Sequence, residues 1–337
     1  MQIDISDAIE PGSLTIRIVT TNETSATLQP DKRFAEAVGQ PGAAASGFLA
    51  EHGLAAWVEI KHGDQADSIL FDTGGMNASL LHNLGRMNLK LSDAGKVIIS
   101  HGHFDHTGSL LKVIPELKHG CELIIHPFSY VQNHMVTTVG NEDVPLADFS
   151  KAVRELKKAR KVTHEVKLPS LDKPQVEKLA SERGVKLVEG GQPVKVCPGT
   201  ATSGEIELFD PREVTPGFYL LKSKADVVKH TFRDEIALFM NVKNKGLVVL
   251  TGCGHTGIVN TIRHAQKLTG IDRVHAVIGG FHEEMSAEAD IERTIQALKS
   301  FEPAIVCGMH CTGLVFNAKM LGSAAHVQGI VGTEFHF

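Results

Sequence analysis

Side chains that stack on nucleic-acid bases are scarce in this sequence of 337 residues, which contains one Trp and two Tyr. The sequence also lacks an excess of positive charge, because its formal net charge at pH 7 is −5. Proteins that bind nucleic acids are usually basic overall and often stack aromatic side chains on the bases. Both shortages therefore argue against nucleic acid as a partner.

Cysteine is also in short supply, with five residues spread along the chain. An odd, sparse set of this kind does not form the disulfide framework of small secreted proteins. The sequence begins without the basic start and apolar run of a signal peptide. Its apolar stretches all fall short of the ~20 residues that a membrane helix needs. We therefore expect a cytoplasmic protein that does not enter a membrane.

Apolar residues make up 42% and charged residues 22% of the chain, which is ordinary for a globular protein with a substantial core. The composition does not break along the chain, so we expect one domain over residues 1–337. Apolar segments of strand length are predicted at residues 14–19, 55–60, 68–71, 96–100 and 122–126. In the last third, predicted strands at 246–250, 274–278 and 304–307 alternate with helices, as in layered α/β folds.

The segment from about residue 130 to 235 carries weaker patterns. We expect a helix from Val144 to Arg160, and its basic stretch from Lys151 to Lys161 is predicted to be a solvated helix face. A role facing phosphate is the alternative interpretation of that stretch. Residues 185–196 alternate in polarity and are predicted to be two paired strands.

Histidine residues follow four of the predicted strands, in the segments that contain His101, His255, His282 and His310. Ligands of α/β sheets gather beyond the carboxyl ends of the strands. We therefore expect these four segments to converge on one pocket.

The first segment has the order His101-Gly-His103-Phe-Asp105-His106. In an extended turn, His101 and His103 can point the same way, and Asp105 and His106 can aim at an adjacent point. Imidazole and carboxylate groups are ligands of zinc. The segment therefore predicts a site for one or two metal ions.

His255 lies in the Gly-rich turn Thr251-Gly-Cys-Gly-His255, and His310 directly follows another strand. The same convergence makes both of them candidate metal ligands. The Cys253 thiolate can bind or bridge metal ions, but a small buried cysteine is an equally good interpretation.

His282 and Asp72 are expected to lie near the metal, but their spacing does not identify them as metal ligands. His282 can be a ligand, a substrate contact, a general acid or a loop residue bonded to its neighbours. Asp72 ends a strand beside the site, and metal-binding histidines usually donate their second N–H group to such an acceptor. We therefore expect Asp72 to orient one of the histidines.

These motifs together resemble a known family. The His101-x-His103-x-Asp105-His106 pattern after the Asp72-Thr-Gly strand end resembles the metallo-β-lactamase superfamily. Three later motifs are similar to the subgroup of dihydropterin-ribofuranosylaminobenzene-phosphate synthase-like metal-dependent hydrolases: Thr251-Gly-Cys-Gly-His255, Gly279-Gly-Phe-His282 and His310-Cys-Thr-Gly.

The resemblance implies a four-layer αββα sandwich of mixed sheets with metals at one rim, and a family-specific insertion at roughly residues 130–235. It implies that His101, His103 and a later residue bind one ion, and that Asp105, His106 and His310 bind a second. The chain departs from the superfamily because Cys253 and His255 stand where a His and a bridging Asp are usual.

The expected metal ion indicates the type of reaction. A bound Zn²⁺ brings the pKa of its water to about 7, which makes hydroxide available as a nucleophile. We expect hydrolysis of an ester, lactone, amide or phosphoester in a small-molecule substrate. Asp105 would hold the water and accept its proton, and His282 would protonate a leaving group or stabilise an oxyanion. Mn or Fe is the alternative to Zn.

Two other functions are compatible with these motifs. The subgroup name implies a transferase that joins a pterin to an aminobenzene ribose phosphate and releases pyrophosphate. A metal-stabilised binding protein without catalytic activity is the third hypothesis. None of the patterns indicates an oligomeric state.

Overall fold

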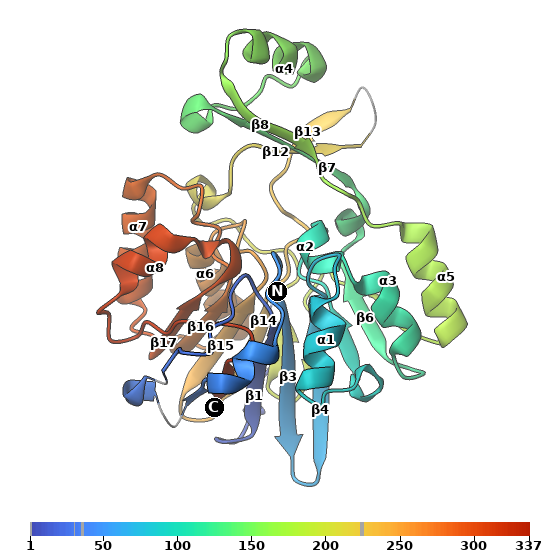
Figure 1. The fold of residues 1–337 in the computed structure, drawn as a ribbon, viewed down its shortest axis with the longest axis vertical. Helices are drawn as coiled ribbons and strands as arrows, with labels where there is room; N and C mark the ends of the chain where they lie inside the picture. The colour runs from blue at the N-terminus through green and yellow to red at the C-terminus, as the bar shows by residue number, and fades with distance from the viewer. Residues whose placement is uncertain (1, 30, 35–36, 223–225) are drawn as a thin grey trace.

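Two large β-sheets lie face to face, and helices cover both outer faces (Figure 1). The structure is a computed structural model that describes residues 2–29, 31–34, 37–222 and 226–337. The layers run helix, sheet, sheet, helix, so the predicted αββα sandwich is confirmed.

The larger sheet has eight strands within these residues, in the order β2-β18-β1-β3-β4-β5-β6-β9. Its strands are β1 (Leu14–Thr20), β2 (Val38–Gly39), β3 (Ala55–His62), β4 (Gln65–Phe71), β5 (Lys96–Ile98), β6 (Glu122–Ile125), β9 (Lys186–Glu189) and β18 (Glu334–His336). The strands from β4 to β9 in this order are parallel neighbours, whereas β1, β3 and β4 pair antiparallel.

The second sheet has six strands in the described part of the chain, in the order β10-β11-β14-β15-β16-β17. They are β10 (Lys195–Cys197), β11 (Thr200–Thr202), β14 (Leu238–Val242), β15 (Gly246–Thr251), β16 (Val274–Gly279) and β17 (Ile305–Gly308). The last three are parallel, so their carboxyl ends lie at one edge of the sheet.

Strand β3 shows how the sequence builds the layers. Ala56 and Val58 join the core between the two sheets, whereas Ala55 and Trp57 face the helices on the other side. Successive side chains of a strand point to opposite faces, so the apolar first half of β3, from Ala55 to Val58, is covered on both faces. Each large apolar side chain buried in this way contributes about 1.5–3 kcal/mol.

Helices cover both outer faces. One group packs on the eight-stranded sheet: α1 (Ser79–Arg86), α3 (Leu110–Val113) and α5 (Lys173–Arg183). The other packs on the six-stranded sheet: α6 (Ile258–Thr269), α7 (Glu288–Ser300) and α8 (Leu314–Met320). Among the described residues, no helix has the length and apolar character needed to cross a membrane.

A third, smaller sheet stands above the rim of the sandwich in Figure 1. Its order is β13-β12-β7-β8, and its strands are β7 (Gln132–Thr138), β8 (Val162–Lys167), β12 (Phe218–Leu221) and β13 (Val227–Lys229). Helix α4 (Phe149–Lys158) covers its outer face. The segment between residues 130 and 235 therefore supplies this sheet, and it also supplies β9, β10 and β11 to the two large sheets.

The pairing registers of the small sheet give it two different faces. Phe218 lies opposite Met135, and Tyr219 lies opposite His134. The rings of His134 and Tyr219 lie 5.4 and 4.7 Å from the ring of Phe149, the first residue of α4. Met135 and Phe218 must therefore face away from α4, towards the sandwich.

Two predictions about this region are wrong. The helix expected from Val144 begins at Phe149, because the Asp148 carboxylate caps it by accepting a hydrogen bond of 3.1 Å from Lys151 N. Residues 185–196 do not form a strand pair, because β9 pairs with β6 and β10 pairs with β11. Alternating polarity reports which face a side chain occupies and carries no information about the partner strand.

Candidate metal centre

Turns at the rim of the sandwich bring the predicted ligands together. The turn after β5 carries His101 and His103, and the short helix α2 (Phe104–Thr107) carries Asp105 and His106. The turn after β15 carries Cys253 and His255, and His310 follows β17. All seven side chains are buried at one place: His101, His103, Asp105, His106, Cys253, His255 and His310.

One group of ligand atoms belongs to His101, Cys253 and His255, and His103 adjoins it through His255. His255 Nε2 lies 3.2 Å from His103 Nδ1, and the ligand atoms of His101, Cys253 and His255 lie within 4.8 Å of one another. His101 Nε2 is buried without a hydrogen-bond partner in the described residues. A buried nitrogen without a partner is costly, and a bound cation would satisfy it.

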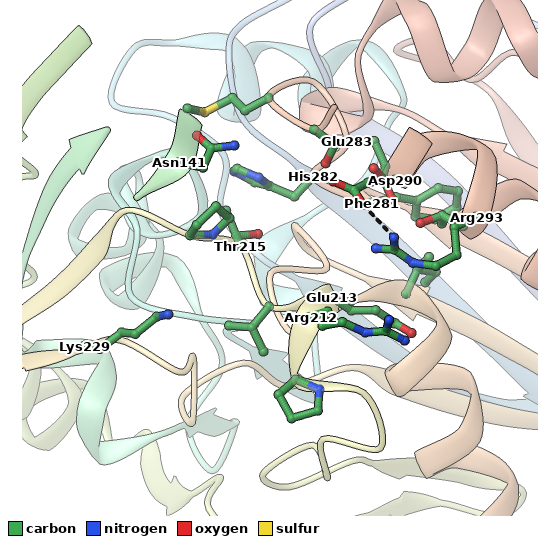
Figure 2. Close-up of a pocket in the computed structure, with 18 residues that line it drawn as sticks. Asn141, Arg212, Glu213, Thr215, Lys229, Phe281, His282, Glu283, Asp290 and Arg293 are labelled. Atoms are coloured by element: carbon green, nitrogen blue, oxygen red, sulfur yellow. Dashed lines mark hydrogen bonds and ion pairs between the residues drawn. The ribbon is translucent and has the colours of Figure 1, made fainter. Parts of the chain in front are cut away.

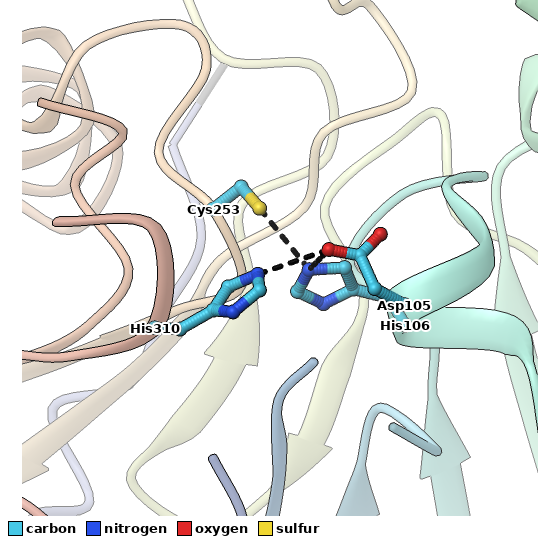
Figure 3. A group of neighbouring side chains, drawn as sticks. All are labelled: Asp105, His106, Cys253 and His310. Carbon is cyan, nitrogen blue, oxygen red and sulfur yellow. Dashed lines mark hydrogen bonds and ion pairs between the residues drawn. The ribbon is translucent and has the colours of Figure 1, made fainter. Parts of the chain in front are cut away.

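The second group consists of Asp105, His106, Cys253 and His310, whose ligand atoms also lie within 4.8 Å of one another (Figure 3). His310 Nε2 lies 3.0 Å from Asp105 Oδ2, and His106 Nε2 lies 3.1 Å from Cys253 Sγ. Cys253 belongs to both groups, so its sulfur lies between the two candidate positions for a metal ion.

These separations fit a zinc-type centre. Two nitrogen ligands at about 2.0–2.1 Å from one tetrahedral zinc ion lie roughly 3.3 Å apart, and the His103–His255 distance is 3.2 Å. The donor set of imidazole, thiolate and carboxylate is the one that zinc accepts. The residues present therefore fit one or two metal ions.

Electrostatics at the site also favour metal binding. Burial, followed by the charges of neighbouring histidines, holds the pKa of His101 well below its usual range, so the imidazole is in the neutral form that binds metals. Burial opposes ionisation of Asp105, but the charge of His106 and a hydrogen bond from His310 hold the pKa of Asp105 well below its usual range. Burial raises the pKa of the Cys253 thiol, so a thiolate forms there only next to a compensating cation.

Asp72 supports the ligands from the end of β4. Its Oδ2 atom lies 2.7 Å from His106 Nδ1 and accepts a hydrogen bond of 2.7 Å from Ser100 Oγ. That same hydroxyl lies 2.9 Å from His101 Nδ1. Burial lowers the pKa of His106, but the charges of Asp72 and Asp105 raise it overall. Asp72 therefore orients His106 as expected, and it acts on His101 through Ser100.

Two carboxylates that the sequence analysis missed hold the ligand turns. Glu235 accepts hydrogen bonds of 2.6 Å from His255 N and 2.7 Å from Thr256 N. Its neighbour Asp234 accepts one of 2.9 Å from Gly102 N, between the first two histidines. Both side chains are buried. Their only signal in the sequence is a pair of acidic residues shortly before the apolar strand β14.

His52 is a third residue that was missed, because a single histidine in a loop carries no motif. Its exposed ring places Nε2 3.3 Å from Asp105 Oδ2. The hydrogen bond to Asp105 raises the pKa of His52, although partial burial opposes the shift. His52 therefore gives the buried carboxylate a contact with a group that reaches solvent.

His282 lies beside the ligands but is absent from both groups of ligand atoms. Its ring centre is 4.1 Å from that of His255, and its Nδ1 has no hydrogen-bond partner in the described part of the chain. Burial, with smaller effects from neighbouring histidines, lowers the pKa of His282 to about 3. The ring is therefore neutral near pH 7.

The metal centre opens into a cavity of about 210 Å³. The small sheet supplies part of its apolar wall through Met135 and Phe218, and the remaining apolar lining consists of Phe104, Leu168 and Met285. His282 and Met285 also line a neighbouring polar cavity of about 280 Å³, which Figure 2 shows with Arg212, Lys229 and Arg293 at its walls. His282 and Met285 therefore border both the metal cavity and the polar cavity.

The basic stretch of α4 does not reach the metal centre. Met135 and Phe218 face the metal cavity, whereas α4 packs on the opposite face of the same sheet. A phosphate bound at the metal would therefore be separated from α4 by the sheet.

The sequence is similar to one protein family and to two archaeal proteins. Residues 52–120 match the family described as the metallo-beta-lactamase superfamily. The chain is 33% identical over 276 residues to the 7,8-dihydropterin-6-methyl-4-(beta-D-ribofuranosyl)-aminobenzene-5'-phosphate synthase of Methanocaldococcus jannaschii, and the match covers 80% of this chain and 83% of that one. An uncharacterised protein of the same organism is 26% identical over 288 residues, covering 85% of this chain and 93% of that one.

Among solved structures, a metal-dependent hydrolase of the beta-lactamase superfamily superimposes with a TM-score of 0.67 at 21% identity. The superposition covers 96% of this chain and 99% of the other. This likeness concerns the fold.

Proposed function

This chain belongs to the metallo-β-lactamase superfamily, in the group of proteins similar to the dihydropterin-ribofuranosylaminobenzene-phosphate synthase, and from this we propose that it is a metal-dependent hydrolase of a small organic molecule. The bond attacked is that of an ester, lactone, amide or phosphoester. The observation that carries the proposal is the pair of buried ligand groups that share Cys253 Sγ.

We assign His101, His103 and His255 to one ion and Asp105, His106 and His310 to the other. Cys253 Sγ lies within 4.8 Å of ligand atoms in both groups, which supports a bridging role. Thiolate and imidazole ligands favour zinc over manganese, and iron is the alternative metal. This assignment names His255 as the third ligand of the first ion.

Zinc bound here would supply an activated water and polarise a carbonyl or phosphoryl oxygen. Asp105 is an ionised carboxylate, because the charge of His106 and the hydrogen bond from His310 outweigh the effect of burial on its pKa. It can therefore orient an attacking water by accepting a hydrogen bond. His52 Nε2, 3.3 Å from Asp105 Oδ2 and partly in solvent, is placed to pass a proton outward.

His282 acts as a neutral hydrogen-bond donor in this proposal. Its partnerless Nδ1 and its place in the cavity lining fit contact with an oxyanion of the substrate. A pKa of about 3 leaves it without a proton to give as an acid near pH 7. Of the two catalytic roles expected for His282, we therefore retain stabilisation of an oxyanion.

The cavity also limits the substrate. A volume of about 210 Å³ with an apolar wall of Phe104, Met135 and Phe218 admits a small apolar group next to the metal. The polar cavity beyond His282 is lined by Arg212, Lys229 and Arg293 together with Glu213 and Glu283, and accepts a polar extension.

The test combines metal content with turnover. Purified protein is expected to contain one or two equivalents of zinc by mass spectrometry and to cleave members of a panel of chromogenic esters, lactones and phosphodiesters. His103→Ala should abolish metal-dependent turnover. His119→Ala is the matched control, because His119 is exposed and precedes β6, at the opposite end of the strands. Full activity of His103→Ala would defeat the mechanism, and bound metal without turnover would favour a binding protein.

A second function is favoured by the 33% identity to the synthase over 80% of this chain. In that case the enzyme would join a pterin to an aminobenzene ribose phosphate and release pyrophosphate. Pyrophosphate production that requires both substrates together would distinguish this transferase from a hydrolase, which would turn over a single substrate with water.

A further inference from the structure

A third cavity, of about 600 Å³, lies between α4 and the four-stranded sheet. His134, Phe149 and Leu221 are among the side chains that line it. His134 and Phe149 belong to the side of the sheet that faces α4, and Met135 lines the metal cavity on the other side. The sheet therefore separates this cavity from the metal centre.

Positive charge dominates the lining of the α4 cavity. Arg154, Lys157 and Lys167 contribute cations, and Glu165 is the one carboxylate among its described lining residues. Glu165 is already engaged, because it pairs with Lys157 and lies 3.2 Å from His134 Nε2. Within the described ranges, neither Arg154 nor Lys167 pairs with a carboxylate, so the cavity keeps two cations without counterions.

The floor of the same cavity is apolar. Phe149 and Val153 are the buried residues of α4, and Leu221 and Val227 approach from the sheet. Lys158 differs from the lining cations, because it lies outside the cavity and pairs with Glu155 at 2.9 Å on the exposed helix surface. The basic stretch thus has one part in solvent and one part at the cavity.

We propose that the α4 cavity binds a small organic phosphate monoester. A phosphate monoester carries a charge of about −1.5 to −2 near pH 7, which matches the two unpaired cations Arg154 and Lys167. Guanidinium and ammonium groups bind phosphate oxygens through charge-assisted hydrogen bonds. The apolar substituent of the ester packs on Phe149 and Val153. This site is independent of the hydrolase reaction proposed for the metal centre.

Calorimetric titration of the metal-loaded protein with hexyl phosphate tests this site. We expect saturable binding of one equivalent, weaker binding of inorganic phosphate, and none of hexanol. The double substitution Arg154→Gln and Lys167→Gln should weaken hexyl phosphate binding at least tenfold, because each removes a charge-assisted contact to the phosphate. Metal content and turnover should stay unchanged. Both side chains are exposed, so the fold should tolerate the changes.

Lys158→Gln removes the same charge from the same helix outside the cavity and should bind hexyl phosphate like the unchanged protein. Absence of saturable binding would overturn the proposal. So would a double variant that binds as tightly as the unchanged protein, since the ligand would then sit elsewhere, such as the metal centre. An equal loss of hexyl phosphate affinity in Lys158→Gln and in the double variant would also overturn it, because binding would then depend on the general surface charge and not on the cavity.

Discussion

Replacing Glu235 with glutamine keeps the shape of a buried side chain but changes what it can accept. One carboxylate oxygen accepts from His255 N at 2.6 Å, and the other accepts from Thr256 N at 2.7 Å and from Thr256 Oγ1 at 2.5 Å. Glutamine has one acceptor oxygen, so its NH₂ group must face at least one of these donors. The turn that carries His255 would therefore lose a hydrogen bond.

The expected cost follows from the type of bond that is lost. A hydrogen bond to a charged group contributes about 1.5–3 kcal/mol, and a donor left unsatisfied in the interior costs a similar amount. The turn can relax when no metal is bound, so part of this cost appears as weaker metal binding. We expect Glu235→Gln to lower zinc affinity by about tenfold to a hundredfold, the range typical of residues that support a metal ligand.

Competition with a chromogenic zinc chelator measures this change, and urea denaturation of the zinc-loaded protein measures the accompanying loss of stability. Glu205→Gln is the matched control, because Glu205 forms a partly exposed ion pair of 2.7 Å with Arg233 away from the metal ligands, and pairs near the surface contribute about 0–1 kcal/mol. Zinc affinity that stays the same in Glu235→Gln, or that falls equally in both variants, would refute the reasoning.

Four further results are expected. Cys253→Ser should reduce bound zinc to one equivalent or fewer by mass spectrometry, because the sulfur belongs to both ligand groups. Phe218→Ala should lower kcat/KM about tenfold to a hundredfold by removing apolar wall from the metal cavity, whereas Tyr219→Phe, on the other face of the sheet, should not. Removing zinc with a chelator should lower Tm reversibly, because the metal stabilises only the folded state. In the metal-free protein, burial lowers the pKa of His103 to about 4, so the unfolded state binds more protons than the folded state below pH ~6.5. The free energy of unfolding should therefore fall by on the order of 3 kcal/mol between pH 6.5 and pH 4. Urea denaturation midpoints at several pH values would measure this fall.

Local spacing accounts for what could be predicted about the candidate site. His101, His103, Asp105 and His106 lie within six residues after a buried strand, and the backbone alone keeps such neighbours close. The turns with His255 and His310 also follow strands, and the carboxyl ends of parallel strands meet at one edge of a sheet. Convergence of these segments therefore followed from the sequence.

The supporting residues required the tertiary structure. Asp234 and Glu235 hold turns that are distant in sequence, and hydrogen bonds to Gly102 N and His255 N leave no periodic pattern. His52 approaches Asp105 across 53 residues of chain, as their numbers show. An isolated residue acquires such a role only after the chain has folded.

The sequence by itself determined the layered α/β class and the positions of the ligand-bearing turns, because both depend on the order of residues along a few neighbouring positions. The tertiary structure decided which strands pair, which face of the small sheet lines the metal cavity, and which carboxylates support the ligands. These features depend on contacts between distant segments. A polarity pattern shows that a residue is buried, but it does not show which part of the chain covers that residue.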